Sequence, residues 1–146
     1  PHILNLSPPI NLKPKWFENF TAYTISKYAM SMNVLGMSSE YKKYNIAVNA
    51  LWPKTVINTA AISMLEGFVT PEQCRKPEIV SDAAYVILSK SSKECTGNFF
   101  IDEYVLKEEG IKDFDKYAVK TGSKLFEDLY LDWYSYFIII KNYNEK

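Results

Sequence analysis

Three short apolar runs, separated by stretches with helical periodicity, constrain the fold of this chain more than any other feature. The runs cover residues 2–6, 46–51 and 97–101, and Ser, Pro or Gly residues lie beside them. Short apolar runs with such boundaries are typical of buried strands. Strands that alternate with helices require a parallel sheet with right-handed crossovers, so the sequence predicts an α/β fold in three layers.

The stretches between the runs predict the helices. Apolar residues recur at helical spacing over residues 16–44, after prolines at positions 8, 9 and 14, and again over residues 77–89. A shorter helix is expected within residues 57–65, and Thr70 followed by Pro71 is a typical helix start. The predicted buried side of the 77–89 helix carries Ile79, Ala83, Ala84, Val86, Ile87 and Leu88.

Composition limits the classes of function. The 146 residues carry 17 basic and 17 acidic side chains without a long basic block, which argues against nucleic acid as a partner. His2 is the only histidine, and Cys74 and Cys95 form no C-x-x-C pair, so we expect no metal site and no histidine-dependent triad. Both cysteines are expected to be reduced thiols inside the cell. The chain starts with proline and shows no signal-peptide pattern, so we expect it to begin inside a longer protein or after processing.

The segment Tyr23-x-x-x-Lys27 is the candidate for chemistry. Residues four apart on a helix share one face, and a cation beside a tyrosine favours the phenolate, so we expect Lys27 to lower the pKa of Tyr23. Tyr23 could then give or take a proton near neutral pH. Taken alone, the spacing favours a simpler interpretation, a packed tyrosine beside a solvated lysine, because helices rich in both residues produce it by chance.

The predicted topology brings further residues to the same place. Ser7 follows the first strand, and Trp52 and Pro53 follow the second. Ligands of open parallel sheets bind outside the carboxyl ends of the strands. The position of Tyr23 and Lys27 on the connecting helix therefore favours a catalytic interpretation over simple packing.

In this order of elements the chain resembles the C-terminal half of a short-chain dehydrogenase/reductase, and one branch of that family in particular. The resemblance runs from residue 1 to about residue 132. It implies the C-terminal half of a Rossmann-type, doubly wound parallel sheet. The segments that carry it are residues 5–9 (NLSPP), 22–28 (AYTISKY), 47–55 (AVNALWPKT), 73–76 (QCRK) and 96–103 (TGNFFIDE).

The resemblance also implies roles for individual residues. Ser7 would hydrogen-bond a substrate oxygen, Tyr23 would exchange the proton, and Lys27 would hold the nicotinamide ribose and depress the tyrosine pKa. Pro53 would line the cofactor site together with two residues of the following loop. Ile57 would lie against the nicotinamide, and Thr59 would bond its amide or a phosphate. A helix cap is an equally favoured interpretation of Thr59.

Two departures from the family pattern bear on function. Lys54 stands where the family has a glycine after Pro53, and Ile57 to Thr59 come one residue late. In addition, the five glycines, Gly36, Gly67, Gly97, Gly110 and Gly122, are too far apart to form the phosphate-binding turn of a dinucleotide fold. We therefore interpret the chain as a fragment that is inactive alone. Residues 1–110 are expected to form the partial dehydrogenase domain, whose first strand has a bare edge, and residues 111–146 a C-terminal extension.

The function expected from the resemblance is NADP-dependent interconversion of a hydroxyl and a carbonyl on a lipid-like substrate, with NAD as the other candidate cofactor. The alternative is a non-catalytic protein that binds a lipid or a partner. The apolar run at residues 134–140 is too short for a membrane span, and we expect none. We expect a homo-oligomer, if one forms, to use the helix over residues 16–44. The relatives suggest a peroxisomal or mitochondrial location.

Overall fold

The computed structural model describes residues 1–63 and 67–131. Three strands form one sheet in the order β1-β2-β3, with β1 at His2–Leu6, β2 at Ala47–Trp52 and β3 at Phe99–Ile101. Both pairs are parallel, with Ile3 opposite Val48 and Trp52 opposite Ile101. The predicted parallel α/β fold is therefore confirmed. Among the described strands β1 pairs only with β2, so its other edge is bare, as expected.

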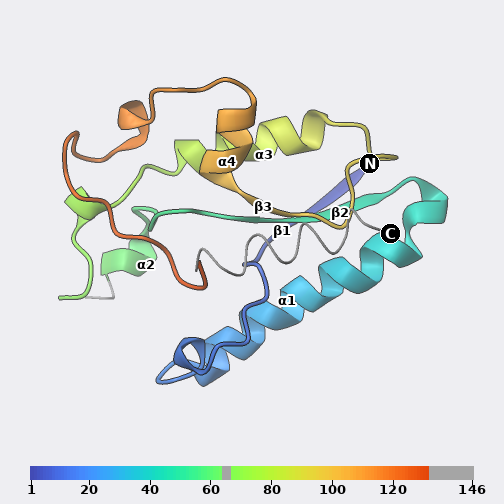
Figure 1. The fold of residues 1–146 in the computed structure, drawn as a ribbon, viewed down its shortest axis with the longest axis horizontal. Helices are drawn as coiled ribbons and strands as arrows, with labels where there is room; N and C mark the ends of the chain where they lie inside the picture. The colour runs from blue at the N-terminus through green and yellow to red at the C-terminus, as the bar shows by residue number, and fades with distance from the viewer. Residues whose placement is uncertain (64–66, 132–146) are drawn as a thin grey trace.

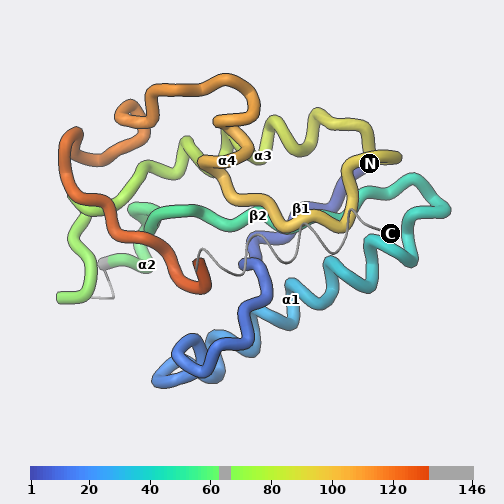
Figure 2. Tube along the Cα trace, in the orientation of Figure 1, coloured from blue at the N-terminus to red at the C-terminus, as the bar shows by residue number. Residues whose placement is uncertain are grey.

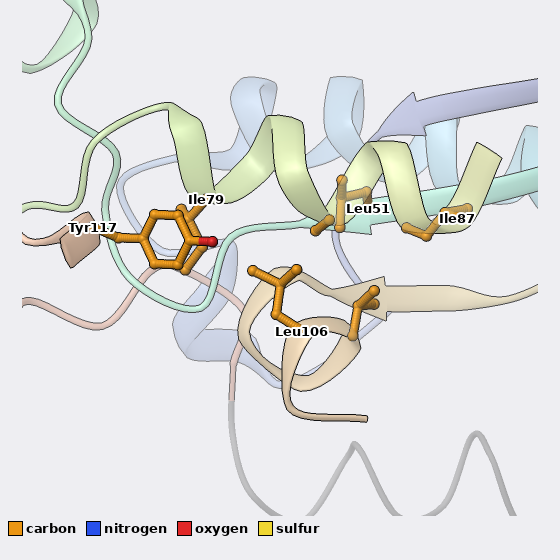
Figure 3. Packing of buried hydrophobic residues seen from close by; sticks show 7 residues of the cluster. Leu51, Ile79, Ile87, Leu106 and Tyr117 are labelled. Atoms are coloured by element: carbon orange, nitrogen blue, oxygen red, sulfur yellow. The ribbon is translucent and has the colours of Figure 1, made fainter. Parts of the chain in front are cut away.

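Helices cover both faces of the sheet (Figure 1). Helix α1, Thr21–Glu40, lies on one face, where Val34 packs with Val48 and Ala50. Helices α3, Glu78–Ser89, and α4, Asp102–Glu108, lie on the other face. There Leu51 packs with Ile79, Ile87, Leu106 and Tyr117 (Figure 3). The alternation of side chains along β2 thus supplies two separate cores.

The remaining elements are short. They are the four-residue helix α2, Ala60–Ser63, and the 3₁₀ helices η1 at Pro14–Trp16, η2 at Lys42–Tyr44, η3 at Pro71–Gln73 and η4 at Asp115–Tyr117. The predicted start at Thr70 is confirmed, because the Thr70 amide donates to Gln73 Oε1 at 3.1 Å. The helix expected within residues 57–65 lies partly outside the described residues, and the apolar run 134–140 lies wholly outside them.

Helix α1 is shorter than the predicted range of residues 16–44. Asn19 has a positive φ of 65°, which interrupts the helical path, and the α-helix begins two residues later. At the other end Asn45 takes the left-handed conformation with φ 56°. The third strand begins at Phe99, two residues later than predicted, although the Gly97 amide already donates to Val48 O and Asn98 O accepts from the Ala50 amide of β2.

The face that α1 turns to the sheet carries hydroxyl groups. Thr24, Ser31 and Ser38 are buried there, whereas Ile25 and Met32 are more than half exposed. Each hydroxyl is satisfied by a backbone carbonyl, for example Ser31 Oγ by Pro8 O at 2.7 Å, so its burial costs little. In α3 the prediction for Leu88 was wrong, because its side chain is 46% exposed, beyond the face that Ile79, Ala83 and Ile87 turn to the core.

Residues 111–131 pack against the rest of the chain. Tyr117 joins the core under α3, and Tyr130 packs with Tyr28, Trp52 and Ile101. The division of the chain at residue 110 stays a prediction, but the described part of the expected extension is firmly docked. Its last residues, the red end of the described trace, lie beside the loop that follows β2 (Figure 2).

Candidate active site

Ser7 lies directly beyond the carboxyl end of β1 and is fully buried. Its backbone amide donates to Asn5 O at 3.0 Å, which turns the chain sharply after the strand. Within the described residues the Ser7 Oγ has no hydrogen-bond partner. A buried hydroxyl without a partner costs free energy, so this atom is a candidate ligand-binding group.

Lys27 ties α1 to this end of the sheet. Its Nζ donates to Leu6 O, the carbonyl that precedes Ser7, at 3.3 Å. The same Nζ lies 5.3 Å from the ring centroid of Trp52 and 5.9 Å from that of Tyr23. The structure therefore places Lys27 beside Tyr23, Trp52 and the residue that precedes Ser7.

Tyr23 is 44% exposed at the edge of this group. Partial burial raises the pKa of Tyr23 above its ordinary value, and the neighbouring Tyr130 and Asp128 raise the pKa further. The expected lowering of the Tyr23 pKa by Lys27 was therefore wrong. The ammonium lies beside the ring and bonds a carbonyl, while burial and Asp128 oppose the phenolate.

The residues predicted from the loop after β2 are spread out. Pro53 directly follows the strand, next to Trp52. Ile57 forms a parallel bridge with Arg75 and packs against the core around Leu51. Thr59 is exposed and immediately precedes α2, a position compatible with either interpretation made from the sequence.

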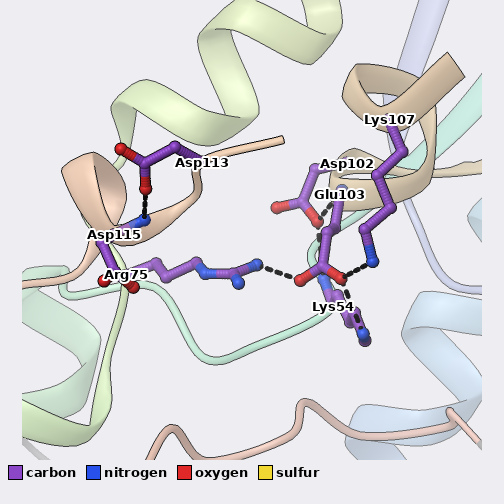
Figure 4. A network of polar contacts seen from close by, with 7 residues as sticks. All are labelled: Lys54, Arg75, Asp102, Glu103, Lys107, Asp113 and Asp115. Atoms are coloured by element: carbon purple, nitrogen blue, oxygen red, sulfur yellow. Dashed lines mark hydrogen bonds and ion pairs between the residues drawn. The ribbon is translucent and has the colours of Figure 1, made fainter. Parts of the chain in front are cut away.

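Lys54, which stands where the resemblance implies a glycine, is bound to α4. Its amide donates to Asp102 Oδ1 at 2.9 Å and its Nζ to Glu103 Oε1 at 2.8 Å. Glu103 also accepts from Arg75 and Lys107, both at 2.6 Å (Figure 4). Burial alone would raise the pKa of Glu103, but the hydrogen bonds from these three cations outweigh it and lower that pKa to about 2. This ionic cluster holds the loop after β2 against the start of α4.

Sequence reasoning missed Asp102 and Asp128. Burial raises the pKa of Asp102 to about 6 against the hydrogen bonds from the amides of Lys54 and Glu103. Burial also raises the pKa of Asp128 to about 6, and the nearby Asp102 adds to that rise. Asp102 lies in segment 96–103, for which the sequence predicted no chemical role, and Asp128 lies in none of the segments that carry the resemblance.

Within the described ranges no group of three or more His, Cys, Asp or Glu side chains could hold a metal ion. In the same part of the chain no helix is both long and apolar enough to cross a membrane.

Curated relatives share high identity with the chain. It is 63% identical over 131 residues to hydroxysteroid dehydrogenase-like protein 2 of Xenopus laevis, and 60% identical over 133 residues to the protein of that name in Homo sapiens. These alignments cover 90% and 91% of the chain but 31% of each relative, so the chain spans about a third of the curated relatives it matches. No protein-family model matches it.

Solved structures share the fold. A protein named as a dehydrogenase from Xanthomonas campestris matches 90% of this chain and 48% of its own, with 45% identity and a TM-score of 0.86. A short-chain dehydrogenase from Mycobacterium thermoresistibile matches 90% of this chain and 47% of its own, with 46% identity and a TM-score of 0.80. A 4-hydroxyisoleucine dehydrogenase complexed with NADH is 27% identical, covering 68% of this chain and 43% of its own, with a TM-score of 0.50. The resemblance to short-chain dehydrogenases, including the hydroxysteroid dehydrogenase-like branch, is confirmed.

Proposed function

We propose that this chain carries the catalytic half of a short-chain dehydrogenase/reductase that interconverts a hydroxyl and a carbonyl on a lipid-like substrate, with NADP as cofactor. The observation that carries the proposal is the bond from Lys27 Nζ to Leu6 O, because it holds Lys27 of α1 next to Ser7, whose hydroxyl has no partner among the described residues. The chain spans about a third of its curated relatives, so the activity is proposed for the complete protein.

Each residue has a distinct part in the proposed reaction. The Ser7 hydroxyl donates to the substrate oxygen, which gives this buried group a partner that the described part of the chain does not supply. Tyr23 gives its proton to that oxygen in reduction and takes it back in oxidation. Since its pKa is raised, Tyr23 holds the proton at neutral pH, which suits the donor role. Lys27 positions Tyr23 and the ribose.

The residues present fit the nicotinamide and ribose end of a dinucleotide cofactor. Lys27 has three N–H donors, of which one bonds Leu6 O, so the ammonium can also bind ribose hydroxyls. Tyr23, Pro53, Ile57 and Thr59 complete the proposed cofactor contacts. The cofactor supplies the hydride when bound. NADH in the 4-hydroxyisoleucine dehydrogenase supports a nicotinamide, whereas the choice of NADP over NAD follows from the resemblance found in the sequence.

The decisive experiment replaces Tyr23 by Phe in the complete protein and measures NADPH oxidation with a panel of carbonyl lipids. Turnover should fall by ~10²–10⁴-fold, the usual contribution of a placed proton donor. Tyr85→Phe is the matched control, because Tyr85 is 75% exposed on α3, and its turnover should match wild type. Equal turnover of Tyr23→Phe and wild type, with both folded by thermal melting, would overturn the proposal in favour of lipid or partner binding without catalysis.

A homo-oligomer through α1 is proposed as well. Ala22, Ile25, Ala29, Met32 and Gly36 form an exposed stripe of small and apolar residues along this helix. Met32→Arg should dissociate the oligomer in size-exclusion chromatography, whereas Lys43→Ala should not.

A peroxisomal or mitochondrial location is proposed from the resemblance alone, and imaging of the tagged complete protein tests it.

A further inference from the structure

Trp52, the last residue of β2, has no part in the proposed reaction, yet it lies beside a residue that has one. Side chains alternate along a strand, so Trp52 shares a face with Val48 and Ala50, which pack with Val34 of α1. Lys27 Nζ, from the same helix, lies over the indole ring, 5.3 Å from its centroid. An ammonium within about 6 Å of an indole centroid is attracted to the electron-rich face of the ring.

The indole ring is held firmly in the fold. Trp52 is only 5% exposed, and its Nε1 donates to Leu129 O at 3.1 Å. The ring also packs against the fully buried Tyr130 ring, with the two centroids 5.9 Å apart. The Tyr23 ring, 5.9 Å from the same Nζ, is 44% exposed. Of the two rings beside Lys27, the indole is therefore the one in a fixed position.

The Lys27 ammonium is thus restrained from the ends of two neighbouring strands. It donates to Leu6 O, at the end of β1, at 3.3 Å, and it lies over Trp52, at the end of β2. A lysine side chain has several rotatable bonds, so ordering it only when a ligand arrives would weaken binding. Attraction to a ring needs no acceptor atom, so Trp52 can restrain the ammonium while N–H donors stay available for ribose hydroxyls.

We propose that Trp52 is a positioning residue for the cofactor, whose indole face holds the Lys27 ammonium where that group binds the nicotinamide ribose. This inference rests on the proposed function. Trp52 acts through Lys27 and not by touching the substrate. Leu129 and Tyr130, which hold the indole, belong to the expected C-terminal extension, so that part of the chain contributes to the site as well.

The test compares NADPH binding by wild type, Trp52→Leu and Tyr28→Phe in the complete protein, measured by calorimetry. Trp52→Leu removes the aromatic face, so affinity should fall by about 3–10-fold, the size of one partly exposed contact between a cation and a ring. Tyr28→Phe is the matched control in the same buried cluster. It removes the bond from the Tyr28 hydroxyl to Asn11 O at 2.6 Å but leaves the indole in place, so its affinity should match wild type.

A second replacement changes the electrostatics of the ring and little else. Trifluorotryptophan at position 52 keeps the shape of the ring and the Nε1–H donor, but fluorine withdraws electron density from the face and weakens its attraction for a cation. NADPH affinity should fall here too, by less than in Trp52→Leu. If Trp52→Leu fails to fold, this replacement takes its place. Wild-type affinity with the fluorinated ring would show that Trp52 serves packing only.

A further readout does not depend on the cofactor. Protons over an aromatic face are shifted upfield in NMR spectra, so the Lys27 ε-methylene signal, assigned by its loss in Lys27→Arg, should move downfield in Trp52→Leu and stay in place in Tyr28→Phe. An unmoved signal in Trp52→Leu, or wild-type NADPH affinity in that variant beside weaker binding by Lys27→Ala, would overturn this inference and leave the proposed function standing. Unchanged NADPH affinity in Lys27→Ala would overturn the proposed cofactor role of Lys27, and this inference with it.

Discussion

Lys27 Nζ donates a hydrogen bond to the carbonyl oxygen of Leu6 at 3.3 Å, so helix α1 is joined to β1 at the residue before Ser7. This bond orients the ammonium toward the carboxyl end of the sheet, between the rings of Tyr23 and Trp52. Lys27 thereby links the candidate proton donor on the helix with the candidate substrate-binding hydroxyl on the loop.

Lys27→Ala should therefore impair two steps. Turnover should fall by ~10²-fold or more, because a positioned cation and its hydrogen bonds are lost, and NADPH should bind more weakly. Steady-state rates and calorimetry on the complete protein measure the two effects. Lys43→Ala is the control, since Lys43 lies over the Tyr44 ring in η2, beyond the C-terminal end of α1. Unchanged NADPH affinity in Lys27→Ala would contradict the cofactor role.

Ser7→Ala should lower activity without lowering stability. The Ser7 Oγ is buried without a partner in the described structure, so its removal should leave the free energy of unfolding unchanged or raise it. Turnover should fall by ~10²–10³-fold if this hydroxyl bonds the substrate oxygen.

The matched control for Ser7 is Ser31→Ala, which removes the bond from Ser31 Oγ to Pro8 O. That change should lower the free energy of unfolding by about 0.5–1.5 kcal/mol and leave turnover intact. Urea unfolding and rate measurements compare the two variants. A Ser7→Ala protein that is less stable yet fully active would show that Ser7 serves packing only.

Glu103→Gln should destabilise the protein strongly. It leaves the buried Arg75 guanidinium without its anion, which costs about 3–5 kcal/mol in comparable buried pairs. The Glu103 pKa is lowered to about 2 on folding, from 4.5, so its stabilisation is complete above pH 4.5 and is lost as the pH falls toward 2. Urea unfolding at pH 7 and pH 3 should show a smaller difference between wild type and variant at pH 3.

The control for Glu103 is Glu109→Gln, because the pair of Glu109 and Lys90 is exposed and 3.6 Å long. Its loss should change the free energy of unfolding by less than about 1 kcal/mol. Equal effects of the two substitutions would refute a structural role for the Glu103 cluster.

Asp102→Asn should be tolerated better than Asp102→Ala. Asp102 Oδ1 accepts from the amides of Lys54 and Glu103, and alanine leaves both donors buried at a cost of about 1–3 kcal/mol. Asparagine keeps an acceptor. Folding raises the Asp102 pKa from 3.8 to about 6, so this group stabilises the fold below pH 3.8 and that contribution is lost as the pH rises to about 6. Urea unfolding should show a smaller pH dependence in Asp102→Asn than in wild type, because Asp128, whose pKa is also raised to about 6, still contributes.

The isolated chain of 146 residues should not bind NADPH with micromolar affinity or turn over, because its five glycines make no phosphate-binding turn. Calorimetry with NADPH on the chain and on the complete protein tests this. Micromolar binding by the chain alone would contradict the expectation, and no binding by either protein would favour the non-catalytic alternative.

The sequence by itself determined the strands, their order along the chain and the pairing of Tyr23 with Lys27. These features follow from local chemistry: apolar runs of strand length, turn residues beside them, and the fixed geometry of residues four apart on a helix. The short α4 escaped prediction, since its few residues follow β3 without a break.

Only the tertiary structure decided which face of α1 is buried and in which direction the Tyr23 pKa moves. Thr24 and Ser31 turn to the core because carbonyls of Trp16 and Pro8, from other parts of the chain, satisfy their hydroxyls. Similarly, Asp128 and Tyr130, more than 100 positions further along the chain, raise the pKa of Tyr23 only after residues 126–131 have docked. Burial and charge depend on neighbours that folding brings together, and no local pattern in the sequence encodes them.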